Sequence, residues 1–163
     1  MKNTGDYDEQ YFISSHKFQT NLERAERQVE EIMGHFPERV LDVGCGLGTT
    51  VKLLRQYGIE AYGMDNAIVL LEKFWKEPYF FLGDARKVPF ENKYFDVVFS
   101  SDFFEHIKEE DIDTIANEMK RVGSIVMAEI AFETKLTERQ AKYHVTNKPR
   151  EWWIEKLPGI DIL

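Results

Sequence analysis

The run Val40-Leu41-Asp42-Val43-Gly44-Cys45-Gly46-Leu47-Gly48 decides the fold of this chain. Its first part is short, apolar and rich in β-branched residues, which predicts a buried strand over 39–43. Glycines then stand at every second position, and glycine lets a backbone turn sharply and approach a ligand closely. The apolar residues that follow predict a helix that ends at Gly58. The run therefore predicts a strand, a glycine loop and a helix in succession.

Further strands and helices alternate along the rest of the chain. Apolar residues at helical spacing predict helices over 18–35, 66–74 and 109–122, and short apolar runs predict strands over 59–64, 79–82, 95–100 and 124–130. This alternation predicts an α/β fold with a doubly wound, mainly parallel, Rossmann-like sheet and helices on both faces. Ligands of such sheets bind beyond the carboxyl ends of the strands.

Composition narrows the class of partner. The 163 residues include 21 Lys and Arg against 29 Asp and Glu, a net charge of −8, which argues against nucleic acid and anionic membranes as partners. No apolar run approaches the ~20 residues of a membrane helix, and the first residues lack the apolar core of a signal peptide. Cys45 is the one cysteine, so no internal disulfide can form, and no metal-ligand spacing is evident. We expect a cytoplasmic location.

The glycine loop differs from a dinucleotide-binding loop in two details. Its spacing is Gly-x-Gly-x-Gly, whereas dinucleotide enzymes use Gly-x-Gly-x-x-Gly. Asp42 at the end of the strand would repel a pyrophosphate, but it suits a ligand that carries an ammonium and a sulfonium. A glycine turn that binds nothing is the alternative.

The next two loops carry further carboxylates. Asp65 ends the second strand, where an acidic residue accepts hydrogen bonds from ribose hydroxyls. It could instead cap the next helix, although Asn66 can serve that purpose. Asp84, between Gly83 and Ala85, is suited to accept a hydrogen bond from an adenine amino group, or is simply a turn residue.

Several of these segments, in this order, resemble one enzyme family. The glycine run resembles motif I of the class I S-adenosylmethionine-dependent methyltransferases, and Gly63-Met64-Asp65 resembles their second acidic motif. Gly83-Asp84-Ala85, Phe95-Asp96-Val97-Val98 and Glu105-His106-Ile107 are similar to the small-molecule branch of that family. The resemblance covers residues 20–130, and it implies S-adenosylmethionine as the cofactor.

The resemblance also implies roles for individual residues. The residues expected to hold the cofactor are Asp42, Gly44, Cys45, Gly46, Gly48, Asp65, Asn66, Asp84, Ala85, Ser100 and Ser101. Asp42 and the glycines would contact its methionine end, Asp65 its ribose and Asp84 its adenine. Tyr7, Tyr11 and Phe12 of an N-terminal arm would close over it, unless the arm is flexible or packs on the core.

The C-terminal part departs from the family pattern. We expect one domain over 1–163, with the arm over 1–17, the cofactor-binding core over 18–130 and an acceptor-side segment over 131–163. Only Gly159–Leu163 remains for the last strands, so the C-terminal strand hairpin is expected to be shortened. The sheet edge left exposed would then form a homodimer or be covered by residues 131–148.

The acceptor is the least determined part of the prediction. His106 and His144 are the candidate general bases, although a structural role for His106 fits the pattern equally well. His144, followed by Lys148-Pro149 and Trp152-Trp153, resembles methyltransferases of sugar metabolism, but paired tryptophans more often pack in a core. The predicted function is methyl transfer to a small molecule, with a sugar or glycan precursor as one class. The alternatives are a cofactor-binding module or subunit without catalysis and, less favoured, an NAD-dependent oxidoreductase.

Overall fold

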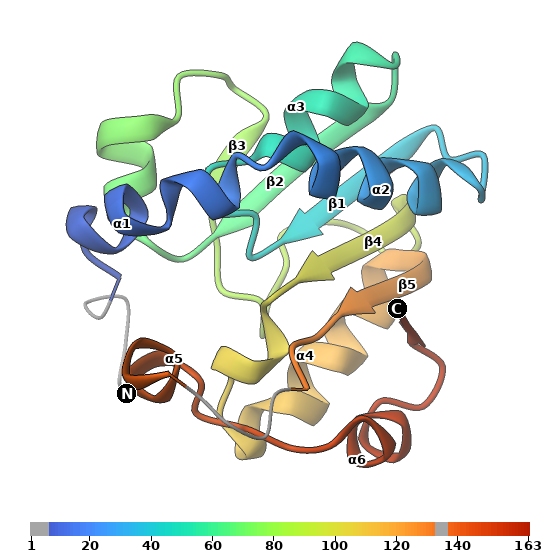
Figure 1. The fold of residues 1–163 in the computed structure, drawn as a ribbon. Coiled ribbons are helices and arrows are strands. Elements are labelled where there is room, and N and C mark those ends of the chain that lie inside the picture. The colour runs from blue at the N-terminus through green and yellow to red at the C-terminus, as the bar shows by residue number, and fades with distance from the viewer. Residues whose placement is uncertain (1–6, 133–136) are drawn as a thin grey trace.

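The fold is a six-stranded parallel sheet between two layers of helices (Figure 1). A computed structural model describes residues 7–132 and 137–163. The strands, in the order β3-β2-β1-β4-β5-β6, all pair in parallel. Their bounds are β1 Arg39–Val43, β2 Glu60–Asp65, β3 Phe80–Leu82, β4 Phe95–Ser101, β5 Gly123–Glu129 and β6 Asp161–Ile162. The predicted α/β class is confirmed.

The helices cover both faces, as a doubly wound sheet requires. Their bounds are α1 Glu9–Gln19, α2 Leu22–Met33, α3 Thr49–Gln56, the π-helix η1 Leu70–Phe74, the 3-10 helix η2 Phe104–His106, α4 Glu109–Val122, α5 Glu138–Tyr143 and α6 Arg150–Lys156. In Figure 1, α1 to α3 lie above the sheet and α4 and α6 lie below it. The strand order reverses at β1, which pairs with both β2 and β4, so the ligand crevice belongs beyond its carboxyl end.

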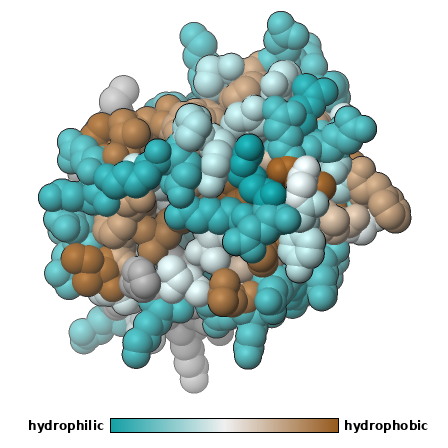
Figure 2. Space-filling model, turned by 90° about the horizontal axis from the view of Figure 1, so that it is seen from above, coloured by the Kyte–Doolittle hydropathy of each residue, from teal (hydrophilic) through white to brown (hydrophobic). Residues whose placement is uncertain are grey.

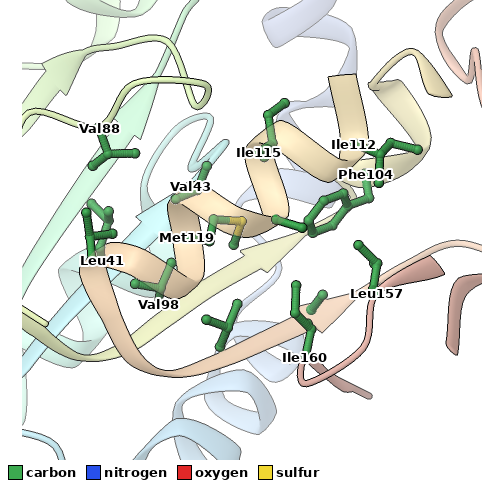
Figure 3. Packing of buried hydrophobic residues seen from close by; sticks show 14 of the residues in the cluster. Leu41, Val43, Val88, Val98, Phe104, Ile112, Ile115, Met119, Leu157 and Ile160 are labelled. Atoms are coloured by element: carbon green, nitrogen blue, oxygen red, sulfur yellow. The ribbon is translucent and has the colours of Figure 1, made fainter. Parts of the chain in front are cut away.

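Alternation along the strands separates two apolar cores. Val40 of β1 packs with Val51 and Leu54 of α3 on one face. Leu41 and Val43 point the other way, toward the inner side of α4 (Figure 3). Both faces of β1 and β4 are therefore dry, which explains why their sequences read as continuous apolar runs.

The C-terminal segment belongs to the core on the α4 side. Leu157 and Ile160 are buried in that cluster, and Trp153 is completely buried. β6 pairs with β5 through two residues, Met127 with Asp161 and Ala128 with Ile162. Among the described residues the sheet has no antiparallel strand, in line with the shortened hairpin that the sequence predicts.

The segment 131–148 does not lie where the sequence analysis expected it. Figure 1 shows α5 beyond the carboxyl ends of the strands, on the opposite side of the molecule from the C-terminus beside β5. Tyr143 and His144 contact His106 there. The prediction that this segment covers the sheet edge is therefore wrong for its described residues, and formation of a homodimer stays a prediction.

Two helices also differ from the expected boundaries. The helix expected over 18–35 begins at Leu22, because the side chain of Asn21 accepts the Arg24 backbone N–H at 3.0 Å and caps it. The helix expected over 66–74 is reduced to the five-residue η1. The carboxylate of Asp65 accepts the Ala67 N–H at 3.0 Å, which holds the start of this segment in a turn.

Hydrophilic and hydrophobic side chains are mixed on the face of the molecule drawn in Figure 2. The helical face seen from above is mostly hydrophilic, with hydrophobic patches mainly toward its left side (Figure 2). In the described part of the chain, no helix combines the length and apolar character needed to cross a bilayer.

Candidate functional site

A cavity of about 550 Å³ opens beyond the carboxyl ends of β1, β2 and β4. The residues that line it come from these strand ends, from α1 and α2, and from the segment after β5. They include Asp42, Gly44, Cys45, Gly46, Asp65, Asn66, Ala85, Ser101, Asp102, Phe103, His106 and His144. Its volume suits a ligand of the size of a nucleoside derivative with a small second molecule.

The glycine loop forms the floor of this cavity. The backbone N–H groups of Gly44 and Cys45 both donate to the Met64 carbonyl, at 2.8 and 3.1 Å, which folds the loop back over β2. Gly44 and Gly48 have φ angles of 76° and 73°, in the left-handed region that favours glycine. A Cβ atom on Gly44 would lie 2.5 Å from the Phe103 ring, and one on Gly48 would lie 2.3 Å from the Phe80 ring.

Asp42 is a buried carboxylate with an unusual proton affinity. Its side chain lies at the end of β1, and the residue is 5% exposed. Burial and then the charge of Asp65 raise its pKa, the charge of Arg24 partly offsets them, and the resulting pKa is about 7. A cation bound in the cavity would favour the ionised form of this carboxylate.

Asp65 ties the glycine loop to the second strand. Its carboxylate accepts the backbone N–H groups of Gly46 at 3.1 Å and of Ala67 at 3.0 Å. Burial raises the pKa of Asp65, and these hydrogen bonds partly counter the rise. Together with Asn66 it lines the cavity.

A polar network closes the end of the cavity below α2. Arg24 donates to Ser101 Oγ and to the Asp102 carboxylate, both at 2.6 Å, and Gln28 donates to Ser101 Oγ at 3.0 Å. The Glu129 carboxylate accepts from both Gln28 and Ser101. Sequence reasoning missed Arg24 and Gln28. Their signal was available, since they lie four positions apart beside the buried apolar face of α2.

His106 and His144 line the cavity beside Tyr7 and Tyr143, which come from the segment before α1 and from the end of α5. Nδ1 of His106 is 3.0 Å from the Tyr143 carbonyl oxygen and 3.0 Å from Tyr7 Oη. Because a carbonyl only accepts, Nδ1 carries the proton in this bond and Nε2 is left as the acceptor. Burial, and then the charge of His144, lowers the pKa of His106 to about 4, so the ring is neutral at physiological pH.

Glu105 lies behind the two imidazoles, completely buried. Its Oε1 accepts the Ala131 N–H at 3.4 Å, and Oε2 has no hydrogen-bond partner among the described residues. Burial, together with the charge of Asp102, raises the pKa of this carboxyl to about 8. The Glu105 backbone carbonyl accepts the N–H groups of Val145 and Thr146, at 2.9 and 3.0 Å, which places His144 beside it.

Three of the residues expected to hold the cofactor lie outside the cavity lining. Gly48 caps α3, and Ser100 is completely buried with an Oγ that has no hydrogen-bond partner among the described residues. Asp84 forms an ion pair with Arg86 at 2.6 Å, and this hydrogen-bonded pairing lowers the pKa of Asp84. Their cofactor contacts stay predictions, as do those of the residues that line the cavity.

Aromatic residues from the N-terminal arm also line the cavity. Tyr7, Tyr11 and Phe12 all do so, whereas residues 1–6 of the arm lie outside the described residues. Tyr143 stacks on Tyr7 with ring centroids 5.6 Å apart. The paired tryptophans are absent from the described lining, and Trp153 packs in the core instead.

Comparison with known proteins points in one direction. A family described as "Methyltransferase domain" matches residues 41–124, just over half of the chain. A demethylmenaquinone methyltransferase from Thermotoga maritima is 31% identical over 111 residues, which cover 64% of this chain and 48% of that protein. A norajmaline N-methyltransferase from Rauvolfia serpentina is 31% identical over 98 residues, 54% of this chain and 33% of that protein. The chain thus matches half or less of the length of these relatives.

A solved structure agrees over a larger share of the chain. An S-adenosylmethionine-dependent methyltransferase from Archaeoglobus fulgidus superimposes with a TM-score of 0.71 and 24% identity, covering 91% of this chain and 73% of that one. At this identity the similarity establishes the fold.

Proposed function

Because the chain belongs to the methyltransferase domain family, we propose that it transfers the methyl group of S-adenosylmethionine to a small-molecule acceptor. The observation that carries the proposal is the cavity at the point where the strand order reverses, with the carboxylates of Asp42 and Asp65 in its wall. The bound cofactor supplies a methyl group that its sulfonium already activates, so the protein mainly has to align the two reactants.

The cofactor would lie across the glycine loop. Its methionine end, with the ammonium and the sulfonium, belongs near Asp42, Gly44 and Ser101. Its ribose belongs at Asp65, which already accepts two backbone N–H groups and has lone pairs left for hydroxyl donors. Its adenine would lie between the loops after β2 and β3, beside Ala85.

The acceptor would bind at the end of the cavity where the aromatic side chains gather. Tyr7, Tyr11, Tyr143 and Phe103 line this end. Flat apolar rings with one nucleophilic oxygen or nitrogen fit such walls well. The names of the two relatives refer to an alkaloid and a quinone, which supports this class. A sugar or glycan acceptor loses the support of the tryptophans, because Trp153 is buried in the core.

His106 and His144 are the side chains proposed to act on the acceptor. Both line the cavity, and their ring centroids are 4.8 Å apart. A hydroxyl acceptor must lose its proton on methylation, and a neutral imidazole can receive it.

Ligand-induced stabilisation tests the cofactor assignment. We expect S-adenosylhomocysteine to raise the melting temperature, because a ligand at 100 times its Kd stabilises a protein by about 2.7 kcal/mol. NAD at the same concentration should leave it unchanged. Stabilisation by NAD alone would overturn the proposal in favour of an oxidoreductase, and cofactor binding without turnover on an acceptor panel would favour a binding module.

The role of Asp84 can be tested separately. We expect Asp84→Ala to weaken S-adenosylhomocysteine binding about tenfold, the loss of one charge-assisted hydrogen bond. Asp113→Ala is the matched control, since Asp113 is an exposed carboxylate on α4 that also pairs with a basic side chain. Isothermal titration calorimetry would give both affinities. Equal affinities in the two variants would show that Asp84 is only a turn residue paired with Arg86.

A further inference from the structure

Glu105, His106 and His144 form a cluster that the sequence did not reveal. Each offers one potential ligand atom, and these atoms all lie within 4.8 Å of one another. The two histidines line the acceptor end of the cavity, and Glu105 lies directly behind them with no exposed surface. The cluster therefore faces the space where the acceptor would bind.

The carboxyl of Glu105 is incompletely satisfied. Its Oε2 is buried and has no hydrogen-bond partner among the described residues, and such orphan atoms in native proteins call for an explanation. Asp102 adds a second carboxylate whose charge acts on both Glu105 and His144, and the ion pair of Asp102 with Arg24 at 2.6 Å offsets part of that charge. The buried Oε2 of Glu105, which lacks a hydrogen-bond partner among the described residues, is the group here that a cation would satisfy.

The imidazole of His106 is oriented as a metal ligand usually is. A ligating histidine uses one ring nitrogen for the metal and donates the other N–H to a carbonyl or carboxylate. Nδ1 of His106 makes this kind of bond to the Tyr143 carbonyl at 3.0 Å, which leaves Nε2 for a metal.

The backbone holds His144 in place as well. The N–H groups of Val145 and Thr146 donate to the Glu105 carbonyl, and Thr146 Oγ1 donates to the Ile107 carbonyl at 2.7 Å. The segment after α5 is therefore fixed on η2, so the two imidazoles and the carboxyl are brought together by main-chain hydrogen bonds.

We propose that Glu105, His106 and His144 bind one divalent transition-metal ion, with zinc as the best match, at the acceptor end of the cavity. Two imidazoles and one carboxylate are a known zinc ligand set that leaves one position open. Atoms bound to the same zinc ion lie about 3.4 Å apart, so small side-chain rotations would complete the site. The open position faces the cavity and would take an oxygen of water or of the acceptor. This last step rests on the proposed function, and it makes the imidazoles ligands instead of bases.

Zinc titration of the metal-stripped protein tests the site. We expect calorimetry to show one zinc ion bound per chain, and cobalt in its place to give the absorption bands of a four-coordinate ion. Glu105→Gln keeps the side-chain size and removes the anionic ligand, and His144→Asn removes one imidazole. Each should weaken zinc binding more than about 100-fold, because even residues that only orient ligands cost 10–100-fold.

Two controls separate this site from other zinc-binding groups. His35→Asn changes an exposed histidine at the end of α2, and Cys45→Ser removes the one thiol. Both variants should bind zinc as the wild type does. Zinc binding that is lost in either control, that persists in both Glu105→Gln and His144→Asn, or that is absent from the wild type would overturn the proposal. The buried Glu105 would then be a protonated carboxyl within the core.

The metal site and the proposed function fail in different ways. Circular dichroism and the melting shift with S-adenosylhomocysteine show whether each variant is folded, and His144→Asn decides the matter if Glu105→Gln does not fold. A wild-type protein that binds S-adenosylhomocysteine but no zinc would overturn the metal site alone. A wild-type protein that binds zinc but no S-adenosylhomocysteine would overturn the proposed function alone.

Discussion

Asp42→Asn is expected to stabilise the ligand-free protein at neutral pH and to weaken S-adenosylmethionine binding by about 10- to 100-fold. The folded-state pKa of Asp42 is about 7, well above its ordinary value near 4. Between these values the folded protein keeps a proton that the unfolded chain releases, so the free energy of unfolding falls as pH rises through this window. Asparagine does not titrate, so this contribution disappears in the variant.

Chemical denaturation at several pH values measures the effect. The charged groups that act on Asp42 are Asp65 from β2 and Arg24 from α2. The stability advantage of Asp42→Asn should be small at pH 4 and reach a few kcal/mol at pH 8, since each pKa unit corresponds to about 1.4 kcal/mol. Asp113→Asn, at an exposed position, is the control. A stability difference that does not change with pH would contradict the raised pKa of Asp42.

Cofactor binding should follow the opposite trend. The positive charges of S-adenosylmethionine favour the ionised form of Asp42, so binding releases a proton in the pH range below about 7. The affinity of the wild-type protein should therefore rise with pH up to that point. The Asp42→Asn variant should bind weakly and lack this part of the pH dependence. A single residue would then lower the stability of the empty site and strengthen its hold on the cofactor.

Gly48→Ala is expected to destabilise the fold by about 2–5 kcal/mol. Two effects add at this position. A φ of 73° costs a residue with a Cβ atom about 1–2 kcal/mol. The new Cβ atom would also lie 2.3 Å from the Phe80 ring, and this overlap costs about 1–3 kcal/mol more. Phe80 stacks on Trp75 at 5.2 Å and lies in the core, so it cannot move aside freely.

Gly58→Ala separates the two effects. Gly58 has a φ of 85°, but a Cβ atom there would meet nothing within 4 Å. We expect Gly58→Ala to cost only about 1–2 kcal/mol, the strain of the left-handed conformation. Denaturant unfolding of both variants gives the steric cost as the difference. Equal losses in the two variants would mean that Phe80 adapts and that the loop is less tightly packed than the structure indicates.

The regular elements near the glycine loop were predictable because local and tertiary signals agree there. Two elements have the predicted bounds. The strand Arg39–Val43 is buried on both faces and therefore reads as a continuous apolar run, and the helix Glu109–Val122 has a single apolar face. The expected helix over 66–74 fails because Asp65 diverts the start of the segment. The helix over Glu9–Gln19 was missed, since its apolar residues do not form one continuous face.

The acceptor end depends on contacts that no local pattern carries. Glu105 and His144 meet only because the chain returns from β5 across the strand ends and pairs its backbone with η2. Arg24 reaches Asp102 in the same non-local way. Motif spacing predicted several residues that line the cavity, among them Asp42, Asp65 and His106, whereas the contacts that bring Glu105 to His144 and Arg24 to Asp102 are visible only in three dimensions.

The pairing of β1 with β4 also has a consequence for folding. Strands that are consecutive in sequence are also neighbours in the sheet from β1 to β3 and again from β4 to β5. β1 pairs with β4, however, although β2, β3 and their connections lie between them in sequence. Closing so long a stretch of chain carries the largest entropic cost of any strand pair in the first five. The cavity spans this seam, with Asp42 on one side and Ser101 on the other. A ligand that contacts residues on both sides of the β1–β4 pair would stabilise this pair by its binding free energy. The cofactor should therefore slow unfolding by holding the two halves of the sheet together.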